Sequence, residues 1–579
     1  MYVKRSKQKN GRVSISIAEG RWEDGTSRSR TVMGFGYLDV LESAHPDALG
    51  YVQGICDRLN AEKAEAKHAV SLEVHPMQKI DARTGGLKNI GCAIPLAYYR
   101  LLGIERTLRN RARGKGHKYD VNAVMRLLVL ERMIAPGSKK AAWENRDGYF
   151  FRSDFSPADV YRSLDFFAHC KEALVAAANK AVSAHHKRDL EDAYYDVTNY
   201  YFEIDAPDGL RKEGVSKERR RRPIVQMGLM QDKDGIPMSF NVFPGDTPDC
   251  LTMLPAMAQA KRDLGCGRMV MVAGKGLNTS TNIAAITLDK NGFVFPQSIR
   301  GTKSPASLTD WVVSPEGHRA KKDDRDGPGF KVKSRLDTKA VYVEGADGKR
   351  HRVDIDVKVV AFWSAKYDRR AKRERAKVVE RAHALVKDPG AYERATHYGA
   401  AKYVRNITFD KKTGEALADA GKHPCIDEGL IARQERLDGY YVIITSEMQL
   451  SDERIIEIYR GLWRIEEAFK VTKSCLGARP VFVWTPAHIH AHFLICYLAL
   501  MIIRLIQYDT GFAYSAEPII EEIAKMRGVR LEDNWWRFFH RSALSDKLAA
   551  TVGLDLTRMN LRLSEVKGLL AKARLPQGK

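Results

Sequence analysis

Five short segments between residues 192 and 273 constrain the fold of this chain most strongly. Asp192 to Phe202 is rich in aromatic and β-branched residues, and Ile224 to Met230 and Pro237 to Phe243 flank an Asp-Lys-Asp-Gly turn. These patterns predict a strand followed by a β-hairpin. Leu251 to Leu264 then has helical spacing, and Arg268 to Ala273 reads as a short buried strand. The order of three strands, a helix and a further strand predicts an α/β fold.

A carboxylate interrupts the apolar side of the helix predicted over residues 451–473. Steps of four and three residues give a stripe with the spacing of a core-facing helix side, which comprises Ile455, Tyr459, Leu462, Glu466, Phe469 and Lys473. An ionised carboxylate in such a place is costly unless it is paired or bound to a metal. Glu466 is therefore either a metal ligand or a member of a buried ion pair with Lys473 or an arginine, and this helix alone favours the ion pair.

The helix and the first strand together resemble the DDE transposases of bacterial insertion sequences. In one subgroup the third carboxylate lies in a Tyr, Arg, Glu, Lys signature helix, whose spacing Tyr459, Glu466 and Lys473 reproduce. Asp196, in the middle of the first predicted strand, matches the first carboxylate of that family. Its neighbours in the strand point to the opposite face.

Two further segments carry the same resemblance, which spans nearly the whole chain. They are Phe-Pro-Gly-Asp-Thr at 243–247 and Ala-Arg-Pro-Val-Phe-Val-Trp at 478–484. The resemblance implies a ribonuclease H-like catalytic core interrupted by a β-rich insertion, with an N-terminal β-hairpin region and helical flanking domains. It also implies that positions 196, 274 and 466 converge, with Asp196 and Gly274 on adjacent strands.

The chain departs from the family pattern at two positions. Leu462 stands where the signature has arginine, although Arg460 and Arg464 are close in sequence. Gly274 stands where the second carboxylate would end a strand, and glycine has no side chain to bind metal. The nearest acids, Asp263 and Asp289, lie in the preceding and following helices. Loss of a carboxylate that both metal ions share should impair the chemistry and leave the fold intact.

The resemblance implies a DNA transposase that binds terminal inverted repeats, cuts, and joins the freed end to target DNA. Asp196 and Glu466 would ligate Mg²⁺ or Mn²⁺, with two ions in an intact site, and Tyr459, Arg464 and Lys473 would contact DNA. A homodimer on DNA is expected. Because of Gly274, activity is expected to be impaired. A non-catalytic DNA-binding protein derived from a transposase, or a ribonuclease H-like nuclease, remains the alternative.

An excess of basic residues agrees with a polyanionic partner. Lys and Arg number 95 against 72 Asp and Glu, so the net charge is +23. The charge is clustered at 219–222, which includes Arg220 and Arg221, at 319–322, and on a predicted helix at 366–377. The helix carries Arg369, Arg370 and Arg373. Each cluster alone is equally well explained as a solvated face, but together they favour contact with DNA phosphates.

The remaining features predict a cytoplasmic, nucleoid-associated protein without a membrane span. The eight cysteines show no paired short spacing, which indicates a reducing compartment. The N-terminus lacks the apolar stretch of a signal peptide, and residues 493–506 are better explained as a core helix. His488, His490 and His492 precede that helix, but the local sequence offers no further ligands for a metal.

The predicted organisation has six parts. A basic β-hairpin followed by a helix occupies 1–65, and a helical block, either a DNA-binding domain or a scaffold, occupies 66–188. The core runs over 189–295, an inserted β-rich domain with the basic helix over 296–436, and the second part of the core over 437–508. A helical tail, which includes Trp535 and Trp536, is predicted for 509–579.

Overall fold

The computed structural model divides into two compact units, Met1–Arg83 and Thr84–Lys579. Each unit has a hydrophobic core of its own. The described residues are 1–23, 26–68, 86–204, 206–214, 222–300, 304–323, 327–344, 348–387, 399–407, 423–531 and 534–575.

Three antiparallel strands and two helices form the first unit. They are β1 (Tyr2–Lys7), β2 (Val13–Glu23), β3 (Thr26–Tyr37), α1 (Leu38–Ala44) and α2 (Ala48–His68). β2 pairs with β3, which confirms the predicted hairpin, and β1 adds an edge strand beside β2. Ile15 and Ile17 are buried with Val52 and Cys56 of α2, because alternate residues of a strand share one face. Two residues of the predicted turn, 24 and 25, lie outside the described residues.

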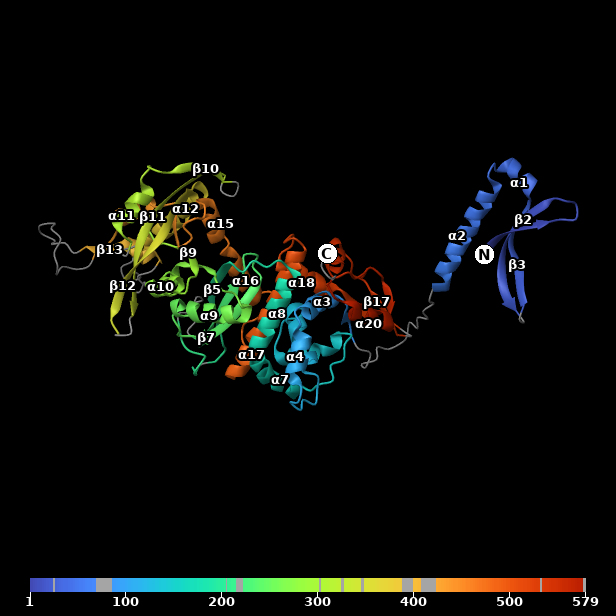
Figure 1. The fold of residues 1–579 in the computed structure, drawn as a ribbon, viewed down its shortest axis with the longest axis horizontal. Coiled ribbons are helices and arrows are strands. Elements are labelled where there is room, and N and C mark those ends of the chain that lie inside the picture. The colour runs from blue at the N-terminus through green and yellow to red at the C-terminus, as the bar shows by residue number, and fades with distance from the viewer. Residues whose placement is uncertain are drawn as a thin grey trace. The chain divides into compact units, whose positions relative to one another are not determined.

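A mixed sheet of nine strands organises the second unit (Figure 1). The strands are β5 (Asp192–Tyr201), β6 (Ile224–Gln231), β7 (Pro237–Pro244), β8 (Val270–Ala273), β9 (Gly292–Pro296), β10 (Arg319–Asp323), β11 (Gly327–Glu344), β12 (Arg350–Ser364) and β15 (Tyr440–Thr445). Their order is β10-β11-β12-β15-β9-β8-β5-β6-β7. β5 is antiparallel to β6 and parallel to β8, and β8 is parallel to β9. The four strands predicted between 192 and 273 are therefore confirmed.

The strands predicted for the inserted domain continue this same sheet. β11 and β12 form a long antiparallel hairpin, and β12 pairs with β15, so that Val360 lies opposite Ile443. Val359 and Ala361 share one buried cluster with Val442 and strand residues of the first part of the core. The insertion therefore does not form a sheet of its own, because its inner strand is hydrogen-bonded to the core.

Helices cover both faces of the sheet and give a three-layer arrangement. One face packs on α9 (Met253–Leu264), α10 (Ser280–Leu288) and α11 (Ala306–Val313), and its β5 residues are Ala193, Tyr195 and Val197. The other face packs on α15 (Asp452–Arg460) through Tyr194 and Val272. Two short 3-10 turns, η2 (Asp249–Leu251) and η3 (Lys275–Leu277), lie at the end of the sheet where β8 stops.

A helical region precedes the sheet in sequence and surrounds one long apolar helix, α17. It consists of α3 (Ala93–Leu101), α4 (Ile104–Ala112), α5 (Val121–Ile134), α6 (Lys139–Glu144), η1 (Asn145–Gly148), α7 (Pro157–His169) and α8 (Lys171–His185), with α17 at Pro486–Asp509. α17 packs on α3, α5 and α7 (Figure 1). It is long and apolar enough to cross a membrane, but 94% of its most apolar window is buried inside the protein. A core helix was predicted here.

The C-terminal residues form helices and a small sheet. The elements are α18 (Ala516–Lys525), β16 (Arg527–Arg530), β17 (Trp535–Phe538), α19 (Ala543–Thr551), β18 (Asn560–Arg562) and α20 (Leu563–Lys572), with β4 (Lys88–Asn89) completing a four-stranded sheet. The expectation that Trp535 and Trp536 lie in a helix is therefore wrong. Trp536 and Phe538 are buried while Trp535 and Arg537 are half-exposed, which is the two-residue period of a strand.

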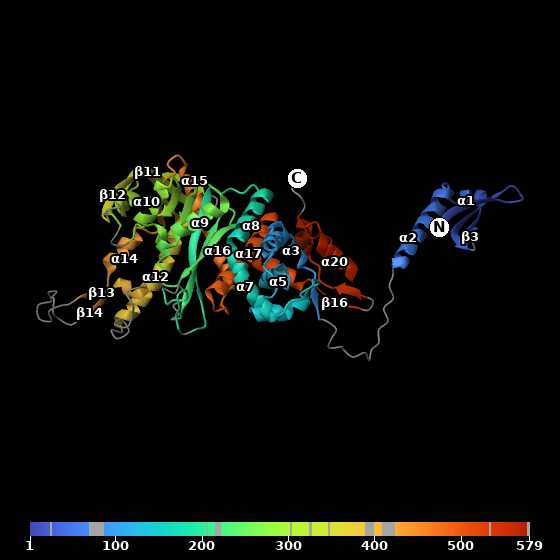
Figure 2. The same cartoon turned by 60° about the horizontal axis from the view of Figure 1, so that its bottom comes forward.

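The basic helix predicted in the insertion is α12 (Ala365–Lys387). It lies beside α14 (Glu428–Glu435), η4 (Gly399–Tyr403) and the two-stranded sheet of β13 (Val404–Ile407) and β14 (His423–Ile426) (Figure 2). These elements share a small apolar cluster that includes Ala382 and Tyr403. The helix therefore has one packed side and one side free to carry charge.

Candidate active site

Asp196 and Gly274 lie on neighbouring strands at the same level of the sheet. β5 and β8 run parallel, and their last paired residues are Tyr195 and Ala273. Asp196 follows the first and Gly274 the second. Asp196 is half-buried, whereas its neighbours from Asp192 to Tyr200 are buried, so its carboxylate is placed where the sheet meets solvent.

The backbone at Gly274 accepts a side chain. Its φ of −73° is ordinary for any L-residue, and a Cβ built there meets nothing within 4 Å among the described residues. Gly274 begins the η3 turn, which Leu277 closes by donating its N–H to the carbonyl of Gly274. The position expected for the second carboxylate is therefore an open gap beside Asp196.

The helix predicted over 451–473 is two helices. α15 ends at Arg460 and α16 (Trp463–Lys473) follows after two residues. The buried residues of α16 are Ile465, Ala468, Phe469, Val471 and Thr472, so its buried side is not the predicted stripe. Glu466 is exposed, and the prediction that it interrupts a buried apolar face is wrong. An exposed carboxylate needs no buried ion pair, so this alternative for Glu466 is removed as well.

A tertiary contact with β5 accompanies the break. The hydroxyl of Tyr194 donates to the carbonyl of Ile458 at 2.9 Å, in the last turn of α15. A Cβ at position 461 would lie 2.4 Å from that hydroxyl and 2.6 Å from Cζ of Tyr194, so only glycine fits. Gly461 therefore allows the close approach of Tyr194 between α15 and α16.

α16 lies over the face of β5 that carries Asp196. Lys473, at its end, donates to Oγ1 of Thr198 at 2.8 Å, and its ammonium lies 5.4 Å from the ring centroid of Tyr200. Alternation places Tyr194, Asp196, Thr198 and Tyr200 on this one face. Because Tyr194 contacts the end of α15 and Thr198 the end of α16, Asp196 lies between the two contacts, across from the helix that carries Glu466.

Tyr459 lines a cavity beside this end of the sheet. The cavity has a volume of about 350 Å³, and Lys275, Arg300, Tyr367 and Tyr441 also line it. Burial, together with neighbouring tyrosines and the charge of Glu466, raises the pKa of Tyr459 to about 12, so its hydroxyl keeps its proton. Arg300, Tyr367 and Tyr441 could not be identified from the sequence, because they come from segments that share no motif. Lys275 was recognisable only as the residue after Gly274.

Arg464, another predicted DNA contact, and the residues near it in sequence pack against other parts of the protein. Arg464 packs its aliphatic carbons against Gly235 in the β6–β7 turn and lies 5.3 Å from the ring of Trp463. Leu462 precedes α16 and packs against buried clusters of the core. Arg460 lies over the rings of Phe330 and Phe362 rather than at the position of the missing signature arginine.

α12 presents a basic stripe to solvent. Arg369, Arg370 and Arg373 are exposed, and Arg370 pairs with Glu374 at 2.8 Å. At 100° per residue these three arginines share one side with two further exposed residues, Lys366 and Lys377.

Other basic positions have structural partners or lie outside the described residues. Arg375, another basic residue of the 366–377 segment, is buried and donates to the carboxylate of Asp438. Arg319 is bound to the buried Asp452 at 2.5 Å. Arg220 and Arg221 lie outside the described residues.

The acids considered as substitutes for a carboxylate at 274 are engaged elsewhere. Asp263 accepts from Gln259 at 2.8 Å, and Asp289 pairs with Lys261 at 2.7 Å. The fold instead brings Asp249 to this end of the sheet. Nδ2 of Asn282 donates to the carbonyls of Cys250 and Leu277, which ties η2 to η3 beside Gly274. No spacing rule links residue 249 to residue 274, so the sequence could not single it out.

The donor set at this end of the sheet suits a hard divalent cation. Asp196 and Glu466 offer carboxylate oxygens, which Mg²⁺ and Mn²⁺ prefer. The three histidines of the 488–492 segment do not supply a competing site. His492 is buried between the Lys139 ammonium at 3.2 Å and the carbonyl of Ala478 at 3.0 Å, and burial holds its pKa well below the usual value.

A family model described as "Transposase DDE domain" matches residues 309–502. The match begins in α11, includes Glu466 and ends in α17, and it supports a place among the DDE transposases. Asp196 and Gly274 precede the matched segment. No curated protein matches the chain.

Proposed function

We propose that this protein is a DNA transposase with a ribonuclease H-like core. The observation that carries the proposal is the placement of Asp196 and Gly274 at one level of two parallel strands, where the β5–β8 pairing ends, with α16 over the face of β5 that carries Asp196. The order β7-β6-β5-β8-β9, with three antiparallel strands followed by two parallel ones, supports the core assignment. The match to a transposase domain supports the activity.

In this proposal Asp196 and Glu466 hold Mg²⁺ or Mn²⁺. A divalent ion held by such carboxylates neutralises charge on a scissile phosphate and activates the attacking water or hydroxyl. Asp196 is half-buried within strand β5 and Glu466 is exposed on α16, so in this proposal DNA approaches both carboxylates. Gly274 contributes no oxygen from a side chain. Cleavage and strand transfer by the chain as it stands are therefore impaired.

Two groups of residues bind DNA in this proposal. Tyr459, Arg464 and Lys473 position the backbone near the cleaved end, and the stripe on α12 contacts phosphates farther away through Arg369, Arg370 and Arg373. The net charge of +23 favours such binding. The physiological ligands are the terminal inverted repeats of a mobile element and target DNA, bound by a homodimer in the cytoplasm at the nucleoid.

A second candidate is a non-catalytic DNA-binding protein derived from a transposase. Gly274 favours it, because one missing carboxylate removes the ligand that two ions would share. The DNA that flanks the gene separates the two candidates. Inverted repeats that bind the protein more tightly than scrambled duplexes of equal length and salt support a transposase, and equal affinity for both contradicts end recognition. Absence of flanking repeats, with retained binding to another sequence, supports the second candidate.

A further inference from the structure

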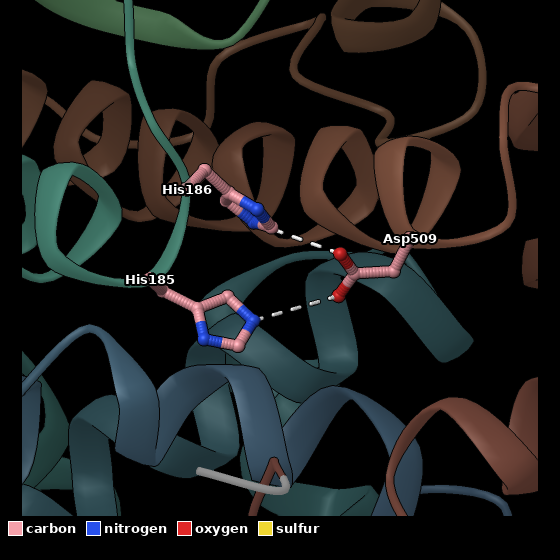
Figure 3. A group of neighbouring side chains, drawn as sticks. All are labelled: His185, His186 and Asp509. Atoms are coloured by element: carbon pink, nitrogen blue, oxygen red, sulfur yellow. Dashed lines mark ion pairs between the residues drawn. The ribbon is translucent and has the colours of Figure 1, made fainter. Parts of the chain in front are cut away.

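Two histidines and an aspartate converge where α8 and α17 end. His185 is the last residue of α8, His186 follows it, and Asp509 is the last residue of α17. Both rings point toward the carboxylate (Figure 3). Nε2 of His186 lies 3.7 Å from Oδ1 of Asp509, and Nε2 of His185 lies 4.0 Å from Oδ2. Three ligand atoms, one from each residue, all lie within 4.8 Å of one another.

These contacts are too long for hydrogen bonds, which join such atoms at about 2.7–3.2 Å. The His186 side chain is only 9% exposed, and among the described residues its Nε2 has no hydrogen-bond partner. Asp509 stands at a helix C-terminus, where the helix dipole disfavours negative charge. Two imidazolium ions would repel each other here, since the ring centroids of His185 and His186 are 4.5 Å apart. A cation between the three groups resolves both difficulties.

We propose that His185, His186 and Asp509 bind one transition-metal ion of the Zn²⁺ class. Two imidazole nitrogens and a carboxylate oxygen are ligands that Zn²⁺ takes, with water in the fourth position. Tetrahedral bonds of about 2.0–2.1 Å place ligand atoms about 3.4 Å apart. Small side-chain rotations bring the observed separations to that value. Nitrogen ligands distinguish this site from the all-oxygen site proposed at Asp196 and Glu466.

The surroundings support a built site with an open position. The buried hydroxyl of Tyr98 donates to Oδ2 of Asp509 at 2.8 Å and holds the carboxylate in place, as partners of metal ligands commonly do. His185 also lines a cavity of about 850 Å³ whose other walls include Arg100, Glu105 and Arg106. Water in that cavity can reach the fourth coordination position.

The ion would join the helical region to the start of β5. Two residues after His186, Arg188 forms a fully buried pair with Asp232 at 2.7 Å, and β5 begins at Asp192. On the other side, Asp509 ends α17, the helix that follows the α16 segment in sequence. The proposed ion therefore fixes the two chain segments that flank the carboxylate site, without touching it.

Cobalt binding to the full chain, with any affinity tag removed, tests the proposal. After chelator treatment the protein is titrated with Co²⁺, whose tetrahedral nitrogen and oxygen complexes absorb in the visible range, and then with Zn²⁺ as competitor. We expect one Co²⁺ per chain to give this tetrahedral band, and one Zn²⁺ to abolish it by displacement. His186→Ala and Asp509→Asn should abolish the band, and Tyr98→Phe should weaken binding about 10-fold.

Two control variants test whether the cobalt band arises from this site. His488→Ala removes a histidine that faces an acid elsewhere, Asp165 at 3.4 Å, and should leave the band unchanged. Glu466→Gln should also leave it unchanged, which separates this proposal from the transposase proposal. His185→Ala serves if His186→Ala does not fold. Absence of stoichiometric binding, or a band that survives both histidine substitutions, would overturn the proposal.

Discussion

Tyr195 of β5 and Ala273 of β8 are the last residues paired in parallel register between these strands, so Asp196 and Gly274 follow them at the same level of the sheet. One carries a carboxylate and the other carries none. A Cβ at Gly274 meets nothing within 4 Å among the described residues, so this position has room for the side chain that the chain lacks. This single relationship connects the fold, the proposed chemistry and its expected impairment.

Gly461→Ala should destabilise the protein by about 1–3 kcal/mol, because the added methyl overlaps the Tyr194 side chain at 2.4–2.7 Å. The measurement is urea unfolding at constant pH. Gly568→Ala is the matched control, since it lies within helix α20 and its Cβ meets nothing within 4 Å in the described part of the chain. The control should be neutral or slightly stabilising. Equal effects of the two substitutions would contradict the packing account of the helix break.

Local patterns in the sequence were sufficient for most of the core. The aromatic and β-branched run at 192–202 and the turn before Pro237 encode their strands directly. The helix break was not predictable, because it depends on the contact of Tyr194 with Ile458, 264 residues away in sequence. Glu466 is exposed because the buried side of α16 consists of Ile465, Ala468, Phe469, Val471 and Thr472.

The pairing of strands that are far apart in the sequence could not be predicted either. The sequence of β12 indicates a strand but not that its partner is β15, so the insertion was expected to be a separate domain. The approach of Asp249 to the η3 turn also depends on tertiary packing, through Asn282. Asp196 and Gly274, by contrast, could be placed on adjacent strands from the order of elements alone.

Charge reversal of Arg369, Arg370 and Arg373 to glutamate should weaken DNA binding and flatten its salt dependence. Each lost phosphate contact lowers the slope of log K against log salt by about 0.9, so the three together lower it by up to about 3. A salt titration of duplex binding measures the slope. The same reversal at exposed Arg558, Lys567 and Lys572 changes net charge equally and should have a smaller effect. Identical slopes in both triple variants would show that α12 is only a solvated surface.

Asp192 should make stability depend on pH in the direction opposite to Asp189. Burial raises the pKa of Asp192 to about 6, despite its bond to Arg454 at 2.9 Å. A raised folded pKa gives stability that is complete below the unfolded value near 3.8 and is lost as pH rises through about 6. The wild-type protein should therefore gain stability relative to Asp192→Asn as pH falls from 7 to 4.

Asp189→Asn is the control with opposite sign. The hydrogen bond from Lys233 holds the pKa of Asp189 below its usual value, so its contribution to stability is lost as pH falls. Denaturant unfolding of the three proteins across this pH range measures both trends. Parallel pH profiles for the two variants would contradict the assignments.

Nicking of an end-containing duplex in Mg²⁺ tests whether the missing carboxylate at position 274 prevents cleavage. Four proteins are compared: the unmodified chain, Gly274→Asp, Gly274→Asp with Glu466→Ala, and Asp249→Asn alone. We expect all four proteins to bind DNA and Gly274→Asp alone to cleave it, since only this variant has carboxylates at positions 196, 274 and 466. Efficient cleavage by the unmodified chain would contradict the account, and loss of that cleavage in Asp249→Asn would identify the substitute ligand.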